Sequence, residues 1–125
     1  MNVVDSCGWL EVLSVGPNSR HFMPILQRQV ALIVPALVLY EVTKLARAFL
    51  DQEHTDGIMA MLGDAIYIEV TREIVDNAVD VSLRYKLATA DSLIYATALE
   101  YDATLWTQDK HFKGLPHVKY FEKSA

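Results

Sequence analysis

The sequence of 125 residues has one cysteine, no surplus of basic residues and no long apolar run. A single Cys7 excludes an intramolecular disulfide and a cysteine-based zinc cage, and it is typical of a reducing compartment, so we expect a cytoplasmic protein. The most apolar run, Val30–Tyr40, has 11 residues and contains Pro35, whereas a membrane helix needs about 20. No basic residue precedes Asp5 to begin a signal peptide. The sequence therefore indicates neither a membrane protein nor an exported one.

The charge balance is acidic, with 11 Lys and Arg against 16 Asp and Glu and a formal net charge of −5. Proteins that bind a phosphate backbone normally carry an excess of basic side chains. The balance therefore argues against simple nucleic-acid binding. If nucleic acid is the substrate, something must offset the charge.

Short apolar segments alternate with amphipathic ones along the whole chain. An apolar content of 52% excludes a disordered chain, and without any linker-like stretch the length predicts a single domain over residues 1–125. The β-branched run Val30–Val34 is typical of a strand buried on both faces of a parallel sheet. The strands that we expect are 2–4, 30–34, 66–68, 104–106 and 118–120.

The segments between these strands have helical periodicity or capping residues. Val38, Val42, Leu45 and Phe49 are spaced by four, three and four residues, which predicts the buried face of an amphipathic helix. The helices that we expect follow Asp5, start near Asn18 with a kink or restart at Pro24, and cover 36–49, 55–62, 71–85 and 90–101. This alternation predicts an α/β fold in which a mostly parallel five-stranded sheet is flanked by helices on both sides.

Four acidic residues fall near the carboxyl ends of the predicted strands, where open α/β sheets bind ligands. They are Asp5 after the first strand, Glu41 in the helix after the second, Asp91 at the start of the helix before the fourth, and Asp109 after the fourth. Two unit charges about 4 Å apart repel by about 4 kcal/mol at an effective dielectric of 20, so such a cluster either takes up protons or binds a cation. Oxygen ligands without cysteine suit Mg²⁺ or Mn²⁺, which cut phosphodiesters in such clusters.

Other interpretations stay open at this point. Asp5 and Asp91 both precede helical runs, where aspartate often serves only as a cap. Glu41 lies in an otherwise apolar stretch, and a position on a solvated helix face explains this placement less easily. Cys7 as a thiol nucleophile lacks an adjacent histidine, and a receiver-type signalling module would need an acceptor aspartate where Glu69 stands. A non-catalytic metal-binding interaction module with the same fold is the main alternative.

Four segments together resemble the PIN-domain nucleases, and among them the VapC-type toxins of toxin–antitoxin pairs. The segments appear in the family's order and span nearly the whole chain. They are Val3–Leu10, Val34–Val42, Ala88–Ala98 and Leu105–Phe112. The resemblance implies a PIN-like fold and a divalent-metal-dependent endoribonuclease.

The resemblance also implies roles for individual residues and partners. Its catalytic and metal-binding set for Mg²⁺ or Mn²⁺ is Asp5, Glu41, Asp91 and Asp109. Ser6 and Thr107 stand where the family often has hydroxyl residues, and we expect them to support the site by hydrogen bonds. Similar toxins form homodimers and are silenced by a cognate antitoxin protein. Beside a predicted ligand, Lys110 is our candidate for contact with RNA phosphates.

Overall fold

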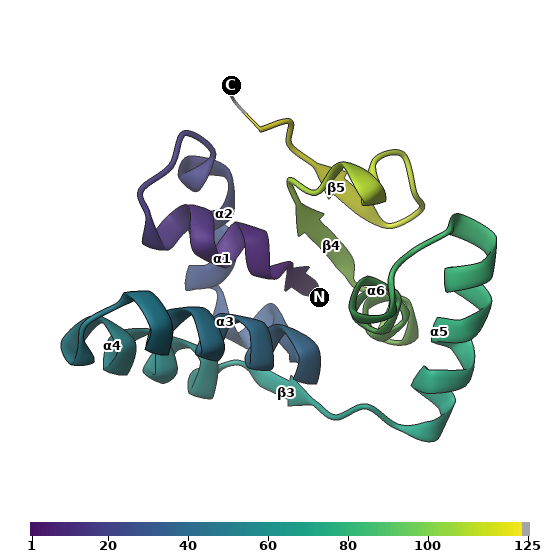
Figure 1. Ribbon diagram of the computed structural model, residues 1–125, viewed down its shortest axis with the longest axis horizontal. Coiled ribbons are helices and arrows are strands. Elements are labelled where there is room, and N and C mark those ends of the chain that lie inside the picture. Colours follow the sequence, from purple (N-terminus) through teal and green to yellow (C-terminus); the bar gives the residue numbers. More distant parts are fainter. Residues whose placement is uncertain (124–125) are drawn as a thin grey trace.

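The computed structural model describes residues 1–123, which build one five-stranded sheet in the order β3-β2-β1-β4-β5 (Figure 1). Every neighbouring pair is parallel, so the expected α/β sheet is confirmed and is fully parallel among the described residues. The strands are β1 (Asn2–Val4), β2 (Leu32–Pro35), β3 (Ile66–Ile68), β4 (Thr104–Thr107) and β5 (Val118–Tyr120).

Helices cover both faces of this sheet, with α1 to α4 on one side and α5 and α6 on the other (Figure 1). The helices are α1 (Ser6–Leu13), α2 (Ser19–Gln27), α3 (Ala36–Phe49), α4 (Gln52–Asp64), α5 (Arg72–Tyr85) and α6 (Thr89–Glu100), with short 3₁₀ turns η1 (Gln29–Ala31) and η2 (Lys110–Phe112). None of the helices within residues 1–123 is long and apolar enough to cross a membrane.

The strand order reverses direction at β1, which lies between β2 and β4. Parallel sheets open a crevice at such a reversal, outside the carboxyl ends of the strands. Val3, Val4 and Leu105 are fully buried in the two central strands. The residues that follow β1 and β4 therefore emerge side by side from the buried core of the sheet.

Some sequence predictions about local structure are wrong. Val30 does not begin the second strand: it lies in η1 with 87% of its surface exposed, because Ala31 N–H bonds Arg28 C=O at 3.0 Å and closes a turn there. The strand starts at Leu32 and includes Pro35, whose extended backbone also precedes α3.

The apolar stripe of α3 also differs at its end. The buried residues are Val38, Val42 and Ala46, at steps of four, and Phe49 at the last position of the helix is 80% exposed. The next helix starts earlier than expected because Asp51 caps it, accepting a hydrogen bond from His54 N–H at 2.8 Å. Pro24 lies inside an unbroken α2.

Candidate metal centre

Asp5 lies where β1 ends and α1 begins, and its side chain is almost fully buried. Its backbone N–H donates to Trp106 C=O at 3.0 Å, which extends the pairing of β1 with β4 by one residue. Its carboxylate Oδ1 accepts a hydrogen bond from Ser6 N–H at 2.9 Å and caps the helix. The capping interpretation is correct for Oδ1, but it does not account for Oδ2.

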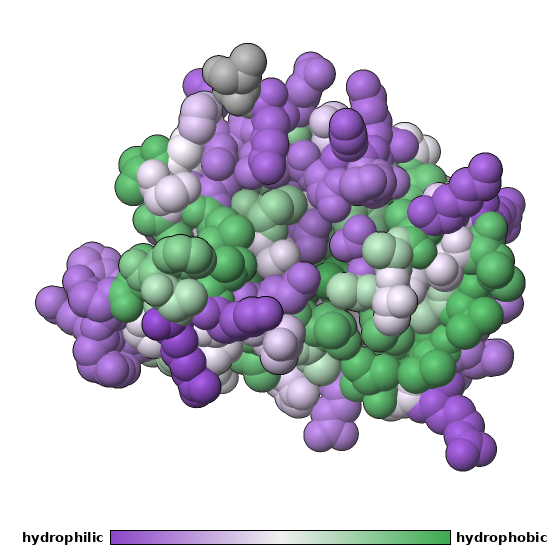
Figure 2. Space-filling model, viewed as in Figure 1, coloured by the Kyte–Doolittle hydropathy of each residue, from purple (hydrophilic) through white to green (hydrophobic). Residues whose placement is uncertain are grey.

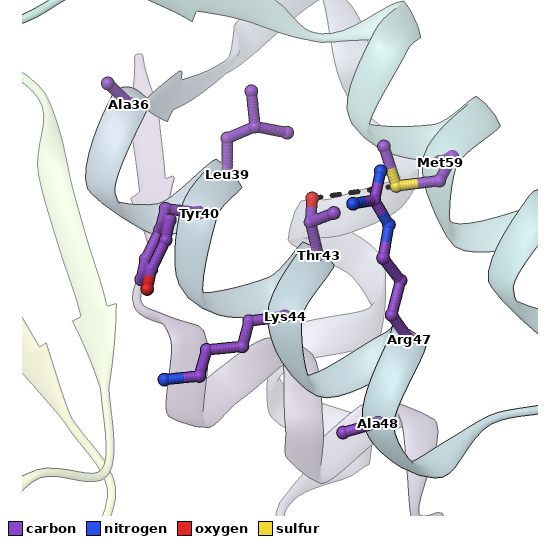
Figure 3. A pocket seen from close by; sticks show the side chains of 8 residues that line it. All are labelled: Ala36, Leu39, Tyr40, Thr43, Lys44, Arg47, Ala48 and Met59. Carbon is purple, nitrogen blue, oxygen red and sulfur yellow. Dashed lines mark hydrogen bonds between the residues drawn. The ribbon is translucent and has the colours of Figure 1, made fainter.

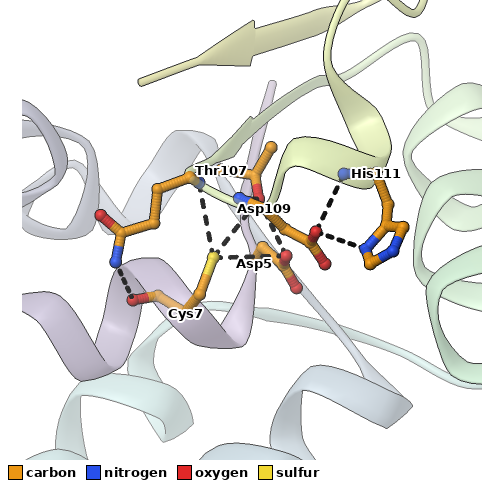
Figure 4. Close-up of polar contacts among 6 residues, drawn as sticks. Asp5, Cys7, Thr107, Asp109 and His111 are labelled. Atoms are coloured by element: carbon orange, nitrogen blue, oxygen red, sulfur yellow. Dashed lines mark hydrogen bonds and ion pairs between the residues drawn. The ribbon is translucent and has the colours of Figure 1, made fainter. Parts of the chain in front are cut away.

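The second carboxylate oxygen of Asp5 connects the first acidic motif to the last (Figure 4). Thr107 Oγ1 donates to Asp5 Oδ2 at 2.9 Å and accepts a hydrogen bond from Asp109 N–H at 3.0 Å. One buried hydroxyl thus fixes two of the four acidic residues relative to each other. Ser6 contacts Asp5 through its backbone N–H, a group that any residue except proline offers.

Cys7 lies beside the same oxygen. Its Sγ donates to Asp5 Oδ2 at 3.4 Å and accepts a hydrogen bond from Gln108 N–H at 3.5 Å. Burial, with the nearby charge of Asp5 next in importance, raises the pKa of the Cys7 thiol to about 12. A thiol with this pKa stays protonated at neutral pH and is not a nucleophile, since the thiolate is the reactive form.

Asp91 joins the cluster from the first turn of α6. It does not cap the helix, because Ala88 occupies the N-cap position and no side chain makes a capping hydrogen bond there. Burial raises the pKa of its carboxyl, and the negative charges of Asp109 and Glu41 raise it further. Asp91 therefore lies close enough to both Asp109 and Glu41 to be repelled by each of them.

The carboxyl of Asp5 is the most strongly perturbed of the four. Burial raises its pKa from 3.8 to about 6, against the lowering effect of its hydrogen bonds from Thr107, Cys7 and Ser6, and the charge of Asp91 raises it slightly more. Each sequence-predicted acidic residue thus contacts, or is electrostatically coupled to, another member of the set.

This arrangement fits a divalent cation. Among residues 1–123, no lysine or arginine forms an ion pair with any of the four carboxylates. Ligand atoms of Asp91, Asp109 and His111 lie within 4.8 Å of one another. Carboxylates gathered in a partly buried site without a lysine or arginine partner are costly unless protonated or bound to a metal. The oxygen-rich set suits Mg²⁺ or Mn²⁺.

Sequence reasoning did not assign a role to His111. Its ring Nδ1 lies 2.7 Å from Asp109 Oδ1, and the same oxygen accepts its backbone N–H at 2.9 Å (Figure 4). The sequence does contain a signal for this contact. An aspartate that caps a helical turn accepts a hydrogen bond from a backbone N–H shortly after it, and His111 is the second residue after Asp109. Lys110 lies between them and is exposed.

A large cavity is separate from the acidic cluster. It has a volume of about 780 Å³ and lies against α3 and Met59 of α4 (Figure 3). Its lining is Ala36, Leu39, Tyr40, Thr43, Lys44, Arg47, Ala48 and Met59. No carboxylate lines it, so it does not extend the metal centre.

Comparisons with known proteins agree with the fold. The family model described as "PIN domain" matches residues 3–118. No curated protein matches the sequence. A chain in a toxin–antitoxin complex from Klebsiella pneumoniae has a TM-score of 0.83 and 22% identity, over 98% of this chain and 99% of that one.

Two further solved structures have the same fold. VapBC2 from Rickettsia felis, bound to a DNA fragment from its promoter, gives a TM-score of 0.75 at 15% identity, over 97% of this chain and 98% of that one. Mycobacterium tuberculosis VapC20, described as a toxin that cleaves the sarcin–ricin loop, gives a TM-score of 0.73 at 14% identity, over 93% of this chain and 95% of that one. The family match covers nearly the whole sequence, and this chain therefore belongs to the PIN domain family.

Proposed function

We propose that this chain is a divalent-metal-dependent endoribonuclease that acts in the cytoplasm as the toxin of a toxin–antitoxin pair. One observation carries the proposal: Asp5, Asp91 and Asp109 come together from distant segments, two of them with raised pKa values, and no lysine or arginine of residues 1–123 pairs with them. A purely structural role would not require this unfavourable arrangement.

The four acidic residues Asp5, Glu41, Asp91 and Asp109 would hold Mg²⁺ or Mn²⁺. Such an ion supplies a Lewis acid for the scissile phosphate and lowers the pKa of a water molecule. Thr107 positions Asp5 and Asp109 through its two hydrogen bonds. Lys110, next to Asp109, would contact phosphate oxygens of the RNA.

The partners of the chain are proposals too. The Klebsiella pneumoniae and Rickettsia felis structures are of complexes with antitoxins, which supports a cognate antitoxin here. The cavity along α3 combines apolar side chains with Lys44 and Arg47, so it suits an amphipathic segment that carries acidic residues. We place the antitoxin there.

A second copy of the chain is the other partner that we propose. Val75, Val79 and Leu83 lie on one face of α5 at steps of four and are 44%, 54% and 78% exposed. Figure 2 shows apolar side chains gathered over α5. A self-associating helix face of this kind would support a homodimer.

Addition of Mn²⁺ or Mg²⁺ to the metal-free protein is expected to raise its melting temperature and to start cleavage of single-stranded RNA. A ligand at 100 times its dissociation constant stabilises the folded state by about 2.7 kcal/mol. Differential scanning fluorimetry and a gel assay with labelled RNA measure the two effects, and EDTA should reverse both. Stabilisation without cleavage of any RNA would identify a metal-binding module and contradict the nuclease function.

Thr107→Val is expected to weaken Mn²⁺ binding by about 10- to 100-fold, as for other residues that hydrogen-bond to metal ligands. Valine keeps the shape of the buried side chain, but Asp5 Oδ2 loses its donor and Asp109 N–H loses its acceptor. Calorimetric titration with Mn²⁺ measures the affinity. Thr107→Ser keeps the hydroxyl and should bind as the parent does; equal affinity of the valine variant would refute the positioning role.

A further inference from the structure

A second cavity adjoins the carboxylate cluster and has a volume of about 550 Å³. It shares Cys7 and Asp109 with the cluster, and its opposite wall consists of Tyr120 and two residues of the C-terminal segment, Glu122 and Lys123. A molecule bound at the carboxylates could therefore extend directly into this cavity.

The C-terminal wall is firmly attached to the rest of the protein. Phe121 N–H donates to Thr107 C=O at 2.9 Å, so the β4–β5 pairing continues beyond the last strand. The Phe121 ring stacks on His21 at a centroid distance of 4.3 Å and meets Phe22 edge-on at 5.5 Å. Its neighbours Tyr120 and Glu122 are consequently held in place over the cavity.

A buried amide pair joins this wall to the loop that carries Asp109. Asn18 Nδ2 donates to Glu122 C=O at 3.0 Å and to Gln108 Oε1 at 3.0 Å. Asn18 and Gln108 are only 7% and 5% exposed. The two walls of the cavity are thus fixed relative to each other before any ligand arrives.

The chemistry of the lining suits a nucleotide. Lys110 and Lys123 line the cavity, and Lys113 Nζ lies 5.6 Å from the centroid of the Tyr120 ring. Lys110 and Lys123 of the lining offset the acidic Asp109 and Glu122, and Lys113 adds a further cation next to Tyr120.

Cations recognise phosphate, and an aromatic ring offers a surface on which a base stacks. The lining contains no aliphatic side chain, which a docking protein helix would require. The observations therefore favour a strand of RNA over a protein segment.

We propose that this cavity binds the nucleotide of single-stranded RNA next to the scissile phosphate, with Lys123 on the phosphate and Tyr120 under the base. The proposal rests on the ribonuclease function and assigns to the C-terminal segment the role of a substrate-binding wall. Tyr120 and Lys123 are determinants of affinity and do not touch the reacting atoms.

The test measures binding of a fluorescently labelled 12-nucleotide RNA by anisotropy, in an Asp5→Asn background that prevents cleavage. Tyr120→Ala should weaken binding by about 5-fold or more, the range found for loss of one stacked base, and Lys123→Ala should weaken it by loss of a phosphate contact. Lys123→Ala should also reduce the slope of log Kd against log salt by about 0.7, the value for one phosphate contact on a single strand.

Conservative variants separate this role from a structural one. Tyr120→Phe and Lys123→Arg keep the ring and the charge and should bind within twofold of the parent. Arg28→Ala removes an exposed cation that precedes β2, at the opposite end of the strands, and should bind equally well. Unchanged affinity in both alanine variants would overturn the proposal, even if they lost binding to a protein partner.

Failure of the subsite and failure of the proposed function have different signatures. If the unmodified chain cleaves RNA with Mn²⁺ while Tyr120→Ala and Lys123→Ala bind RNA normally, the subsite is wrong and the nuclease function stands. If the two alanine variants bind RNA weakly but the unmodified chain cleaves no RNA, the cavity binds RNA as proposed and the nuclease function is wrong.

Discussion

Replacement of Asp5 with asparagine is expected to abolish metal-dependent RNA cleavage and, at the same time, to make the metal-free protein more stable. Loss of a buried metal ligand should lower the cleavage rate by about 100-fold or more. The stability gain follows from the raised pKa of about 6 against 3.8. Since one pKa unit corresponds to about 1.4 kcal/mol, the ionised carboxylate destabilises the fold by up to about 3 kcal/mol at pH 7.5.

The sign of the stability difference between the parent and Asp5→Asn can be checked by measuring unfolding at different pH values. Well below pH 4 the carboxyl is protonated in both folded and unfolded chains, and the two variants should have similar stability. As the pH rises from about 4 to 6, the unfolded chain ionises first, so the parent loses stability relative to the asparagine variant. Urea unfolding in EDTA should therefore show a larger difference at pH 7.5 than at pH 4.5.

A matched control is available at the start of α4. Asp51 is exposed and caps this helix, and hydrogen bonds from His54 lower the pKa of its carboxyl. Asp51→Asn should not stabilise the protein and should leave cleavage unchanged. If Asp5→Asn retained full activity, or if its stability matched the parent at both pH values, the proposed metal centre would be refuted.

Gly8→Ala is expected to destabilise the protein by about 1–3 kcal/mol, the range for overpacking a core. A methyl group on Gly8 would lie 2.6 Å from Val4 Cγ1 and 2.9 Å from Phe22 Cδ1, both buried and tightly packed. Glycine is required here because α1 packs directly on the end of β1. Thermal and urea unfolding measure the loss.

The same substitution in α4 should have the opposite sign. Gly57 and Gly63 lie inside this helix, and a methyl group on either would meet no atom within 4 Å. Alanine is a better helix former than glycine by about 0.5–1 kcal/mol. Gly57→Ala and Gly63→Ala should therefore stabilise the protein, and destabilisation by all three substitutions would show that close packing at Gly8 is not the cause.

The acidic cluster could be predicted from the sequence because its positions depend on strand ends. Asp5 comes directly after a strand whose apolar residues identify it, and the carboxyl ends of parallel strands meet at one edge of the sheet. Asp109 could be placed at that edge for the same reason. Asp91 and Glu41 lie on helices that begin near it, and the electrostatic coupling of Asp91 to both Asp109 and Glu41 reflects this shared location.

Other features depend on contacts that no local pattern encodes. Val30 is β-branched, but the turn closed by Ala31 and Arg28 determines its conformation. Asn18 bonds Gln108 across 90 positions and Glu122 across 104. A capping signal at Asn18 is visible in the sequence, whereas its partners are not, so the C-terminal wall of the second cavity could be identified only in the fold.

The backbone of Asp5 has a dynamic consequence, because its N–H bonds Trp106 C=O and so belongs to the central ladder of the sheet. Amide groups in such ladders exchange their hydrogen with solvent only when large parts of a protein unfold. We therefore expect the backbone amide of the proposed metal ligand Asp5 to exchange slowly. Its position does not depend on the closure of a surface loop.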